Sequence, residues 1–342
     1  MQLELRVLGA APAEPVICVD GAFGCRGLEL SHWPGHRTPP DLTHELSTGC
    51  ALRFARLGAP ERERRAEGAR LAVNNHYDTD GACALYAVLQ PEAALARERE
   101  LLELAAAGDF FEAPSELAVA LDAAIGNLGD RARSAFAREL PVLSDAERHE
   151  RCYTHVHAQL PRWLAGDLVS ARGLYELELD AHRADRRVVA RARRSDHPQV
   201  ALTHLCIDEP LLRGSDPGRH ALFGAGVRDR VLLSFPREGG HCHRLVVSTR
   251  SWFDLPGLAR RPRPDLAALA RELDRLDPRA GRDGAGWHAQ ASDTPSPELW
   301  FGREVLEFFR ERNDALEPSG LAPQRVLDAV LSACSRMPSP AG

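Results

Sequence analysis

The stretch "RLAVNNHYDTDGACALYAVL", residues 70–89, decides the fold and most of what the sequence says about function. An apolar run ends here in His76, Asp78 and Asp80, which occupy every second position, and Gly81 follows at once. On a β-strand, residues at i, i+2 and i+4 point to the same face. We therefore expect a buried strand over 69–73, three polar side chains grouped at its carboxyl end, and a helix that begins at Gly81.

One histidine and two carboxylates in this arrangement favour a divalent cation of the Mn²⁺ or Mg²⁺ type, because oxygen ligands suit both ions and an imidazole tilts the choice towards Mn²⁺. A calcium-binding EF-hand loop is excluded, since the twelfth position counted from His76 is Ala87 and not the required glutamate. A simpler alternative stays open: Asp78 and Asp80 only cap the helix that follows.

The rest of the chain alternates between strand and helix patterns in its first third. Strand-like runs at 2–9, 15–19, 27–33 and 69–73 are separated by helical patterns at 38–58 and 91–110. This alternation predicts an α/β domain of Rossmann-like type with a mostly parallel sheet, whose chemistry lies at the carboxyl ends of the strands.

The pattern then changes twice, which predicts three parts. Residues 112–194 are almost entirely helical, and its last part, 182–194, is expected to be a solvated stretch; strand-like runs at 199–207, 229–235 and 242–252 precede a helix at 263–276. We expect an α/β domain over 1–111, a helical connector over 112–194 and a smaller α+β domain over 195–342, with the active site in the cleft between the two domains.

Composition limits the function classes. The chain has 342 residues, a net charge of −6 and a pI of about 6.2, which argues against a surface that coats long nucleic acid. It has no apolar stretch of 18 residues and no signal-like start, so we expect a cytoplasmic protein without a membrane partner. All 43 basic residues are arginine, which is typical of a GC-rich bacterial genome. The eight cysteines form no CxxC pair, which excludes zinc-ribbon and thioredoxin-like sites.

The segment "HYDTDGACALYAVL" (76–89) resembles the first motif of the DHH phosphoesterase superfamily. The family's second motif is an aspartate after the next helix, and "AAAGDFFEAP" supplies Asp109. The Asp-His-His motif that names the family does not occur downstream. Upstream, "ICVDGAFGCRGLELSHWPGH" supplies Asp20, His32 and His36 before a segment, "ELSTGCALRFARL", that is similar to the helix following that motif. This order implies a circularly permuted member.

The second domain is similar to the DHHA1 domain that accompanies many DHH proteins. The succession "HRLVVSTRSW", "RPDLAALARELDRL" and "RDGAGWH" repeats its strand, helix and glycine-rich loop. The resemblance implies a substrate-binding loop formed by Gly284, Gly286, Trp287 and His288, although Trp287 replaces one of the family's glycines. Arg244 and Arg250, on the preceding strand, are further candidates for a phosphate contact, with a solvated strand face as the alternative.

The resemblance implies a hydrolase that uses two Mn²⁺ or Mg²⁺ ions on a small phosphate ester, a short oligonucleotide or a phosphoanhydride. His76 and Asp78 would hold one ion, Asp80 with His32 or Asp20 the other, and Asp109 would be shared. His36 would orient the phosphate or protonate the leaving oxygen. Because a literal Asp-His-His motif is missing, the alternative is a non-catalytic relative that binds a nucleotide or a metal as a sensor or interaction scaffold. A homodimer is expected only because homodimers are the commonest oligomers of soluble proteins.

Overall fold

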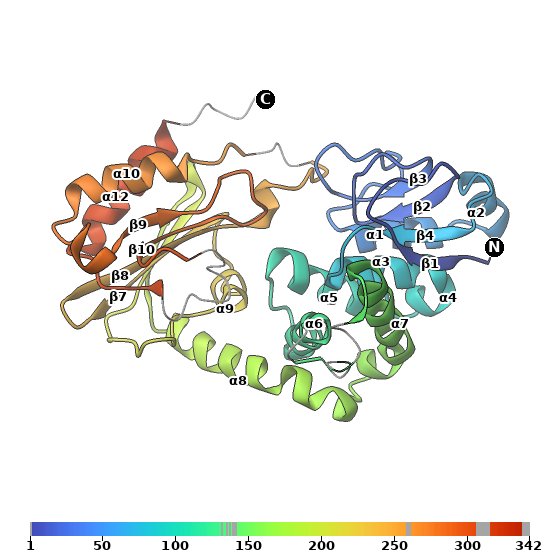
Figure 1. Ribbon diagram of the computed structural model, residues 1–342, viewed down its shortest axis with the longest axis horizontal. Helices are drawn as coiled ribbons and strands as arrows, with labels where there is room; N and C mark the ends of the chain where they lie inside the picture. Colours follow the sequence, from blue (N-terminus) through green and yellow to red (C-terminus); the bar gives the residue numbers. More distant parts are fainter. Residues whose placement is uncertain are drawn as a thin grey trace. The chain divides into compact units, whose positions relative to one another are not determined.

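The computed structural model describes residues 2–130, 133, 134, 136, 138, 142–257, 261–305 and 315–336 (Figure 1). The chain divides into two compact units. Unit 1 comprises Met1–Ala181 and the short segment Phe253–Leu258, and unit 2 comprises His182–Trp252 and Ala259–Gly342. The fold class predicted from the sequence, α/β with a parallel sheet and a second α+β part, is confirmed.

Unit 1 contains a four-stranded sheet in the order β1-β4-β2-β3, with every neighbouring pair parallel. Its strands are β1 (Glu4–Val7), β2 (Val16–Val19), β3 (Gly27–Leu30) and β4 (Leu71–Asn74). Its helices are α1 (Ser47–Ala55), α2 (Ala59–Arg65), α3 (Thr79–Leu89), α4 (Pro91–Leu95), α5 (Glu98–Phe110), α6 (Glu116–Gly129) and α7 (Asp145–Leu164). A 3₁₀ turn, η2 (Val169–Ala171), follows α7.

The central strand β2 is buried on both faces, which explains its unbroken apolar sequence. Ile17 and Val19 face the large core formed with α1, α3, α5, α6 and α7. Val16 and Cys18 face a small cluster on the other side, closed by the loop that carries Cys25. The sheet therefore carries a large helical core on one face and only a small cluster on the other.

The connection from β2 to β3 is only seven residues long, although parallel neighbours usually need a long crossover. Asp20 begins the connection in the left-handed region, with φ of 49°. Gly27, the first residue of β3, has φ 93°, and a Cβ atom there would lie 2.4 Å from the carbonyl oxygen of Val16. The sharp turn fixes the position of the Asp20 side chain at the carboxyl end of the sheet.

The extent of one expected helix was wrong. The helix expected over 38–58 begins only at Ser47, because Pro39 and Pro40 open a turn in which the Leu42 N–H donates to the Pro39 carbonyl at 2.8 Å. Within the segment expected as a connector, α6 and α7 belong to unit 1, since their apolar faces complete its core. The stretch expected to be solvated continues helix α8 (Arg172–Val189) and then forms a strand.

Unit 2 is built on a six-stranded mixed sheet in the order β5-β6-β7-β8-β10-β9. The strands are β5 (Arg193–His197), β6 (Leu202–Cys206), β7 (Arg230–Arg237), β8 (Gly240–Val247), β9 (Gly286–Ala289) and β10 (Glu298–Gly302). The helices described after α8 are α9 (Arg219–Phe223), α10 (Leu266–Leu276) and α12 (Pro323–Ser335), with 3₁₀ turns η3 (Pro198–Val200), η4 (Thr249–Ser251) and η5 (Arg282–Gly284). Helices α10 and α12 share one apolar core with the sheet.

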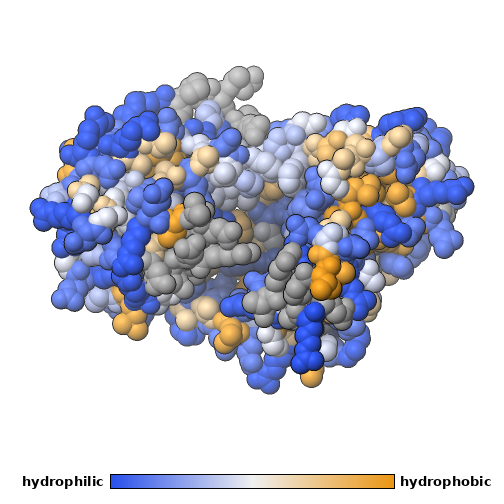
Figure 2. All heavy atoms as spheres, viewed as in Figure 1, coloured by the Kyte–Doolittle hydropathy of each residue, from blue (hydrophilic) through white to orange (hydrophobic). Residues whose placement is uncertain are grey.

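Hydrophilic residues cover much of the face drawn in Figure 2, and the apolar residues on it form small separate groups. The large apolar side chains that are most exposed, such as Val142, Val169 and Leu212, are likewise scattered along the chain. Among the described residues, no helix combines the length and the apolar character needed to cross a membrane.

A buried ion-pair network holds β8 to β10 in unit 2. The Arg244 side chain is fully buried, with Nε 2.6 Å from Glu298 Oε2 and Nη2 2.9 Å from Oε1. Arg219 Nη2 lies 2.6 Å from the same Oε1. Burial opposes ionisation of Glu298, but the two guanidinium groups outweigh it and lower the pKa of Glu298 to about 2.

We predict that Glu298→Gln lowers the free energy of unfolding of unit 2 by about 3–5 kcal/mol, because it removes the main counter-ion of the buried Arg244, which keeps only Asp216 at 3.3 Å, and of the mostly buried Arg219. The Glu298 pKa is depressed from 4.5 on folding, so this contribution is present above pH 4.5 and is lost as the pH falls towards 2. Urea unfolding at several pH values measures both effects. Glu272→Gln, which breaks a more exposed pair with Arg336, should cost less than about 1 kcal/mol; equal losses in both variants would contradict the account.

Candidate metal centre

Polar side chains gather at the carboxyl ends of β2, β3 and β4. Asp20 directly follows β2, His32 comes two residues after β3, and Asn74 is the last residue of β4. Because these strands are parallel neighbours, the three ends meet at one edge of the sheet. The position agrees with the expectation from the strand and helix pattern.

The expectation that His76, Asp78 and Asp80 share one face of a strand was wrong, because β4 ends at Asn74. The Asn74 side-chain oxygen accepts hydrogen bonds from the N–H groups of Asn75 at 2.6 Å and His76 at 3.2 Å. This local turn replaces the strand ladder. His76 and Asp78 therefore lie in a short loop, and Asp80 lies in the first turn of α3.

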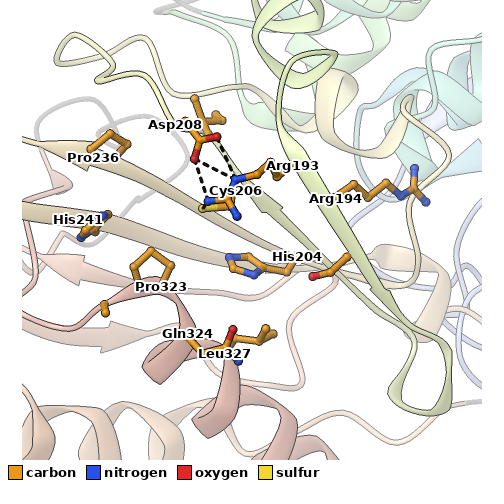
Figure 3. Close-up of a pocket in the computed structure, with 13 residues that line it drawn as sticks. Arg193, Arg194, His204, Cys206, Asp208, Pro236, His241, Pro323, Gln324 and Leu327 are labelled. Atoms are coloured by element: carbon orange, nitrogen blue, oxygen red, sulfur yellow. Dashed lines mark hydrogen bonds and ion pairs between the residues drawn. The ribbon is translucent and has the colours of Figure 1, made fainter.

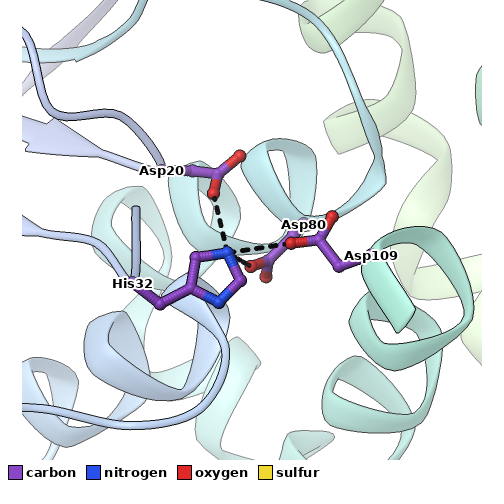
Figure 4. A group of neighbouring side chains, drawn as sticks. All are labelled: Asp20, His32, Asp80 and Asp109. Atoms are coloured by element: carbon purple, nitrogen blue, oxygen red, sulfur yellow. Dashed lines mark ion pairs between the residues drawn. The ribbon is translucent and has the colours of Figure 1, made fainter. Parts of the chain in front are cut away.

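Four buried side chains, Asp20, His32, Asp80 and Asp109, form the first of two clusters (Figure 4). The Nε2 atom of His32 lies at its centre, 2.9 Å from Asp109 Oδ2, 3.7 Å from Asp20 Oδ1 and 3.8 Å from Asp80 Oδ2. Three carboxylates thus face one imidazole nitrogen in the interior of unit 1.

The orientation of His32 determines which of its nitrogens faces the carboxylates. Its Nδ1 lies 2.5 Å from the carbonyl oxygen of Glu45, which can only accept, so Nδ1 carries a proton. In the neutral ring, Nε2 then presents a lone pair to the three carboxylates. A histidine whose other nitrogen donates to a backbone carbonyl is the usual arrangement of a metal ligand. Phe253 stacks on the ring, with centroids 3.7 Å apart.

Asp80 also has a structural role. Its Oδ2 accepts the N–H of Ser47 and its Oδ1 that of Thr48, both at 2.8 Å, so the carboxylate binds the N-terminus of α1. Burial and the neighbouring Asp20 nevertheless raise the pKa of Asp80, against the effect of these hydrogen bonds. Each oxygen keeps a further lone pair for another partner.

Asp109 lies in the last turn of α5, whereas the sequence placed it just beyond the helix. Burial, followed by the charges of Asp80 and Asp20, raises the pKa of Asp109 well above its usual range. Like charges held together in a low-dielectric interior are stable only if protons or a cation compensate them.

The second cluster contains Asp20, His76 and Asp78. His76 Nε2 lies 2.8 Å from Asp78 Oδ2 and 3.3 Å from Asp20 Oδ2, and its Nδ1 lies 2.8 Å from the side-chain oxygen of Asn75. Burial opposes protonation of His76, but the carboxylates of Asp78 and Asp20 outweigh it and raise the pKa of His76 well above its usual range. Asp78 also caps α3, since its Oδ1 accepts the N–H of Gly81 at 2.8 Å.

Asp20 belongs to both clusters and so joins them. Its Oδ1 accepts from Ser47 Oγ at 2.8 Å and from Trp33 Nε1 at 3.1 Å, which orients the carboxylate. Its Oδ2 is buried and accepts no hydrogen bond within the described residues. The two clusters therefore form one continuous centre of four carboxylates and two imidazoles. Asp20, and not Asp109, is the residue common to the two clusters found among the described residues.

This donor set fits divalent metal ions. Carboxylates and imidazoles suit Mn²⁺ and, with fewer nitrogens, Mg²⁺. The excess of negative charge and the buried Asp20 Oδ2 both call for a cation. The buried aspartates and His32 can hold a metal ion without large rearrangement, since their ligand atoms lie within 4.8 Å of one another. Capping alone, the simpler reading, explains one role of Asp78 but not the convergence.

Tyr153 on α7 was not found from the sequence. It is fully buried, and its hydroxyl donates to the His76 carbonyl at 2.9 Å and accepts from Asn74 Nδ2 at 3.2 Å. Tyr153 thus holds the loop that carries the second cluster. The periodicity of α7 places Tyr153 on its apolar face but gives no sign of this contact. Ser47, which orients Asp20, was also missed.

The remaining site residues predicted from the sequence lie elsewhere. His36 belongs to neither cluster; its Nδ1 accepts the N–H of Thr38 at 3.2 Å. In unit 2, Gly284 ends η5, Gly286 begins β9 and Arg250 lies in η4.

The other three unit 2 candidates have contacts inside that unit. Arg244 lies in the buried ion-pair network with Glu298. Trp287 is buried, with Nε1 donating to Asp277, and His288 Nε2 lies 3.1 Å from the Gly302 carbonyl. The segment 286–289, expected to be part of a loop, is an edge strand because it pairs with β10.

Comparison with known proteins identifies a family. No curated protein matches the chain. One solved structure found by the comparison is that of PggH, a pGpG-specific phosphodiesterase from Vibrio cholerae, with 11% sequence identity and a TM-score of 0.32 over 86% of this chain and 97% of that chain. Similarity at this level is no basis for an activity. The model of a family of unknown function, DUF6687, matches residues 8–339, and the chain belongs to that family.

Proposed function

We propose that the protein is a metal-dependent phosphoesterase of DHH type, acting on a small phosphorylated molecule or a short oligonucleotide. The observation that carries the proposal is the pair of ligand clusters joined at Asp20. Two adjacent cation sites that share a carboxylate are typical of enzymes that hydrolyse phosphate esters. Resemblance of residues 76–89 to the first DHH motif supports the same reaction class.

The ligand assignment follows the clusters. Asp20, His76 and Asp78 would hold one Mn²⁺ or Mg²⁺ ion, and Asp20, His32, Asp80 and Asp109 the other. When bound, the ions would supply a water molecule of lowered pKa and charge stabilisation for the phosphoryl oxygens. Asp20 is the shared ligand in this proposal.

The protein's own groups keep the centre ordered for that chemistry. Glu45 fixes the tautomer of His32, and Ser47 and Trp33 fix the Asp20 carboxylate. Phe253 covers one face of His32 and excludes water from it. Because these groups already hold the ligand side chains in place, little reorientation is needed during the reaction, and electrostatic stabilisation is then most effective.

His36 is proposed as the proton donor or phosphate-orienting group. Because its Nδ1 accepts the Thr38 N–H, the neutral ring carries its proton on Nε2, which is then a donor. Burial lowers the pKa of His36 and favours this neutral form. The unit 2 residues Gly284, Gly286, Trp287, His288 and Arg250 stay candidates for substrate contact, as the DHHA1 resemblance implies.

A non-catalytic role is the second candidate, and one observation favours it. Both oxygens of Asp80 already bind the N-terminus of α1, so Asp80 is explained without a metal ion. A protein that had lost its chemistry could keep this carboxylate for stability and use the centre as a sensor or scaffold. Hydrolysis of a phosphate ester by the purified protein distinguishes the phosphoesterase from the non-catalytic protein.

We predict that the purified protein hydrolyses bis-p-nitrophenyl phosphate with Mn²⁺ and not with chelator. Asp109→Asn should reduce kcat by about 10²–10³-fold, the size found for loss of one major electrostatic contribution. Asn keeps the shape of Asp109 and removes the charge that a cation needs. Asp41→Asn, at a carboxylate of unit 1 paired with Arg65, is the matched control and should leave turnover unchanged. Equal activity in both variants, or turnover that continues in the presence of chelator, would contradict the proposal.

We also predict a positioning role for Tyr153. Tyr153→Phe removes the hydroxyl that holds the His76 loop, so the Mn²⁺ concentration for half-maximal activity should rise about 10–100-fold, the usual cost of losing a residue that orients metal ligands. The variant should regain its kcat at saturating Mn²⁺. Tyr86→Phe, at a buried tyrosine of α3, is the control. If both variants need the same Mn²⁺ concentration, Tyr153 only fills space.

A further inference from the structure

The pocket of about 740 Å³ in unit 2 (Figure 3) is lined by two arginines that are already paired. Arg193 Nη2 lies 2.8 Å from Asp208 Oδ1. Arg194 Nε lies 3.0 Å from Asp196 Oδ2. A charged ligand in this pocket would have to break one of these ion pairs. The metal centre of unit 1 differs, because its buried Asp20 Oδ2 accepts no hydrogen bond within the described residues.

The two ligand clusters of the metal centre differ in their access to solvent. In the first cluster, around His32, the four side chains are between 0% and 8% exposed. In the second cluster, the side chains of His76 and Asp78 are 27% and 35% exposed, and the shared Asp20 is buried. A cation in the second cluster can therefore meet water or a ligand directly, whereas a cation in the first cluster is enclosed.

Two phenyl rings close the first cluster on the side of His32. Phe253 stacks on the imidazole, with ring centroids 3.7 Å apart. Phe110 lies edge-on to Phe253, with its centroid 6.1 Å away, and at the same distance from the imidazole. Both phenyl side chains are buried. From this side, a chelator reaches the first cluster only after one of the rings has moved.

Phe253 begins a short segment, residues 253–257, that we call the strap. The strap belongs to unit 1, although the chain before Phe253 and after Leu258 belongs to unit 2. Asp254 holds the loop that follows β3 at two points. Its backbone N–H donates to the His32 carbonyl at 2.9 Å, and its Oδ2 accepts the N–H of Gly35 at 2.8 Å. These contacts keep the ring of Phe253 over the imidazole.

This arrangement would retain a cation in the first cluster. Three carboxylates would surround the ion in a low-dielectric interior, and its release would require a local opening that breaks the contacts of the strap. Zinc sites show the same distinction, since structural sites are closed and catalytic sites keep an open position. The partly exposed second cluster has the character of an open site.

We propose that the strap retains the cation of the first cluster, so that the centre holds one slowly exchanging ion there and one labile ion in the second cluster. The labile ion is then the one that meets the phosphate of the substrate, a role that rests on the proposed function. Retention of the other ion does not depend on hydrolysis. Asp254 is a positioning residue in this account, because it acts on the first cluster through the backbone of His32.

The test is the release of Mn²⁺ from the loaded full chain into an excess of 4-(2-pyridylazo)resorcinol, a chelator that changes colour when it binds the metal, in the absence of substrate. We expect two phases of one ion each, the second at least about tenfold slower because it requires local opening. Asp78→Asn should remove the fast phase and keep the slow one. Its asparagine side chain can still cap α3, so the helix is preserved.

Asp254→Ala should speed the slow phase by about tenfold, because the Gly35 N–H loses a charged acceptor, and should leave the fast phase unchanged. Asp254→Asn keeps an oxygen for that N–H and should restore most of the slow release. Asp265→Ala is the matched control, since Asp265 accepts the N–H of Ala268 at the same distance, 2.8 Å, in unit 2. The control should change neither phase.

Release of both ions in one phase would overturn the proposal. A slow phase that is unchanged in Asp254→Ala would also overturn it, because the ion would then leave through the second cluster and not past the strap. Equal acceleration in Asp265→Ala would show an effect unrelated to the strap. Hydrolysis together with one-phase release would contradict this inference alone, whereas two-phase release without hydrolysis would contradict only the phosphoesterase. Absence of bound Mn²⁺ would contradict both.

Discussion

The structure of unit 1 depends on one electrostatic constraint: Asp20, Asp80 and Asp109 are buried around a single imidazole nitrogen of His32. Isolated carboxylates in the interior of a protein are costly. The N-terminus of α1 offsets part of this cost through its hydrogen bonds to Asp80, and Ser47 and Trp33 offset another part at Asp20. The remaining charge is an argument for cations, because like charges buried together need protons or a cation to compensate them.

The same constraint explains how the sheet is used. The tight connection after β2 holds Asp20 in the left-handed region, a conformation that aspartate tolerates better than most residues. The turn made by Asn74 ends β4 early and brings His76 and Asp78 back towards Asp20. The strained backbone of Asp20 and the hydrogen bonds of Asn74 thus lie at the carboxyl ends of strands, which is where α/β proteins have their active sites.

Much of the fold of unit 1 and of its metal centre could be predicted from short sequence patterns. The alternation of strand and helix patterns predicts the parallel sheet. Five residues of the metal centre follow the end of a strand or lie at the start of a helix, and the sequence pattern indicates these positions. What could not be predicted are contacts between distant segments. The hydroxyl of Tyr153 reaches the His76 loop from α7, and Phe253, which follows β8 in the sequence, stacks on His32. Neither residue differs in pattern from an ordinary core residue.

In unit 2, by contrast, the sequence suggested features that the structure does not have. Arg244 was a candidate for phosphate contact, with a solvated strand face as the alternative, but its side chain is fully buried beside Glu298. Pairing with β10 turned the expected loop around Trp287 into a strand.

The most direct test of the account is the number and coupling of Mn²⁺ ions bound by the purified protein, measured by equilibrium binding together with electron paramagnetic resonance. The account predicts two ions per chain with magnetic coupling between them, and loss of that coupling in Asp20→Asn, because Asp20 is the only residue common to the two clusters found among the described residues. One ion or none, or two ions whose coupling is indifferent to Asp20, would contradict it.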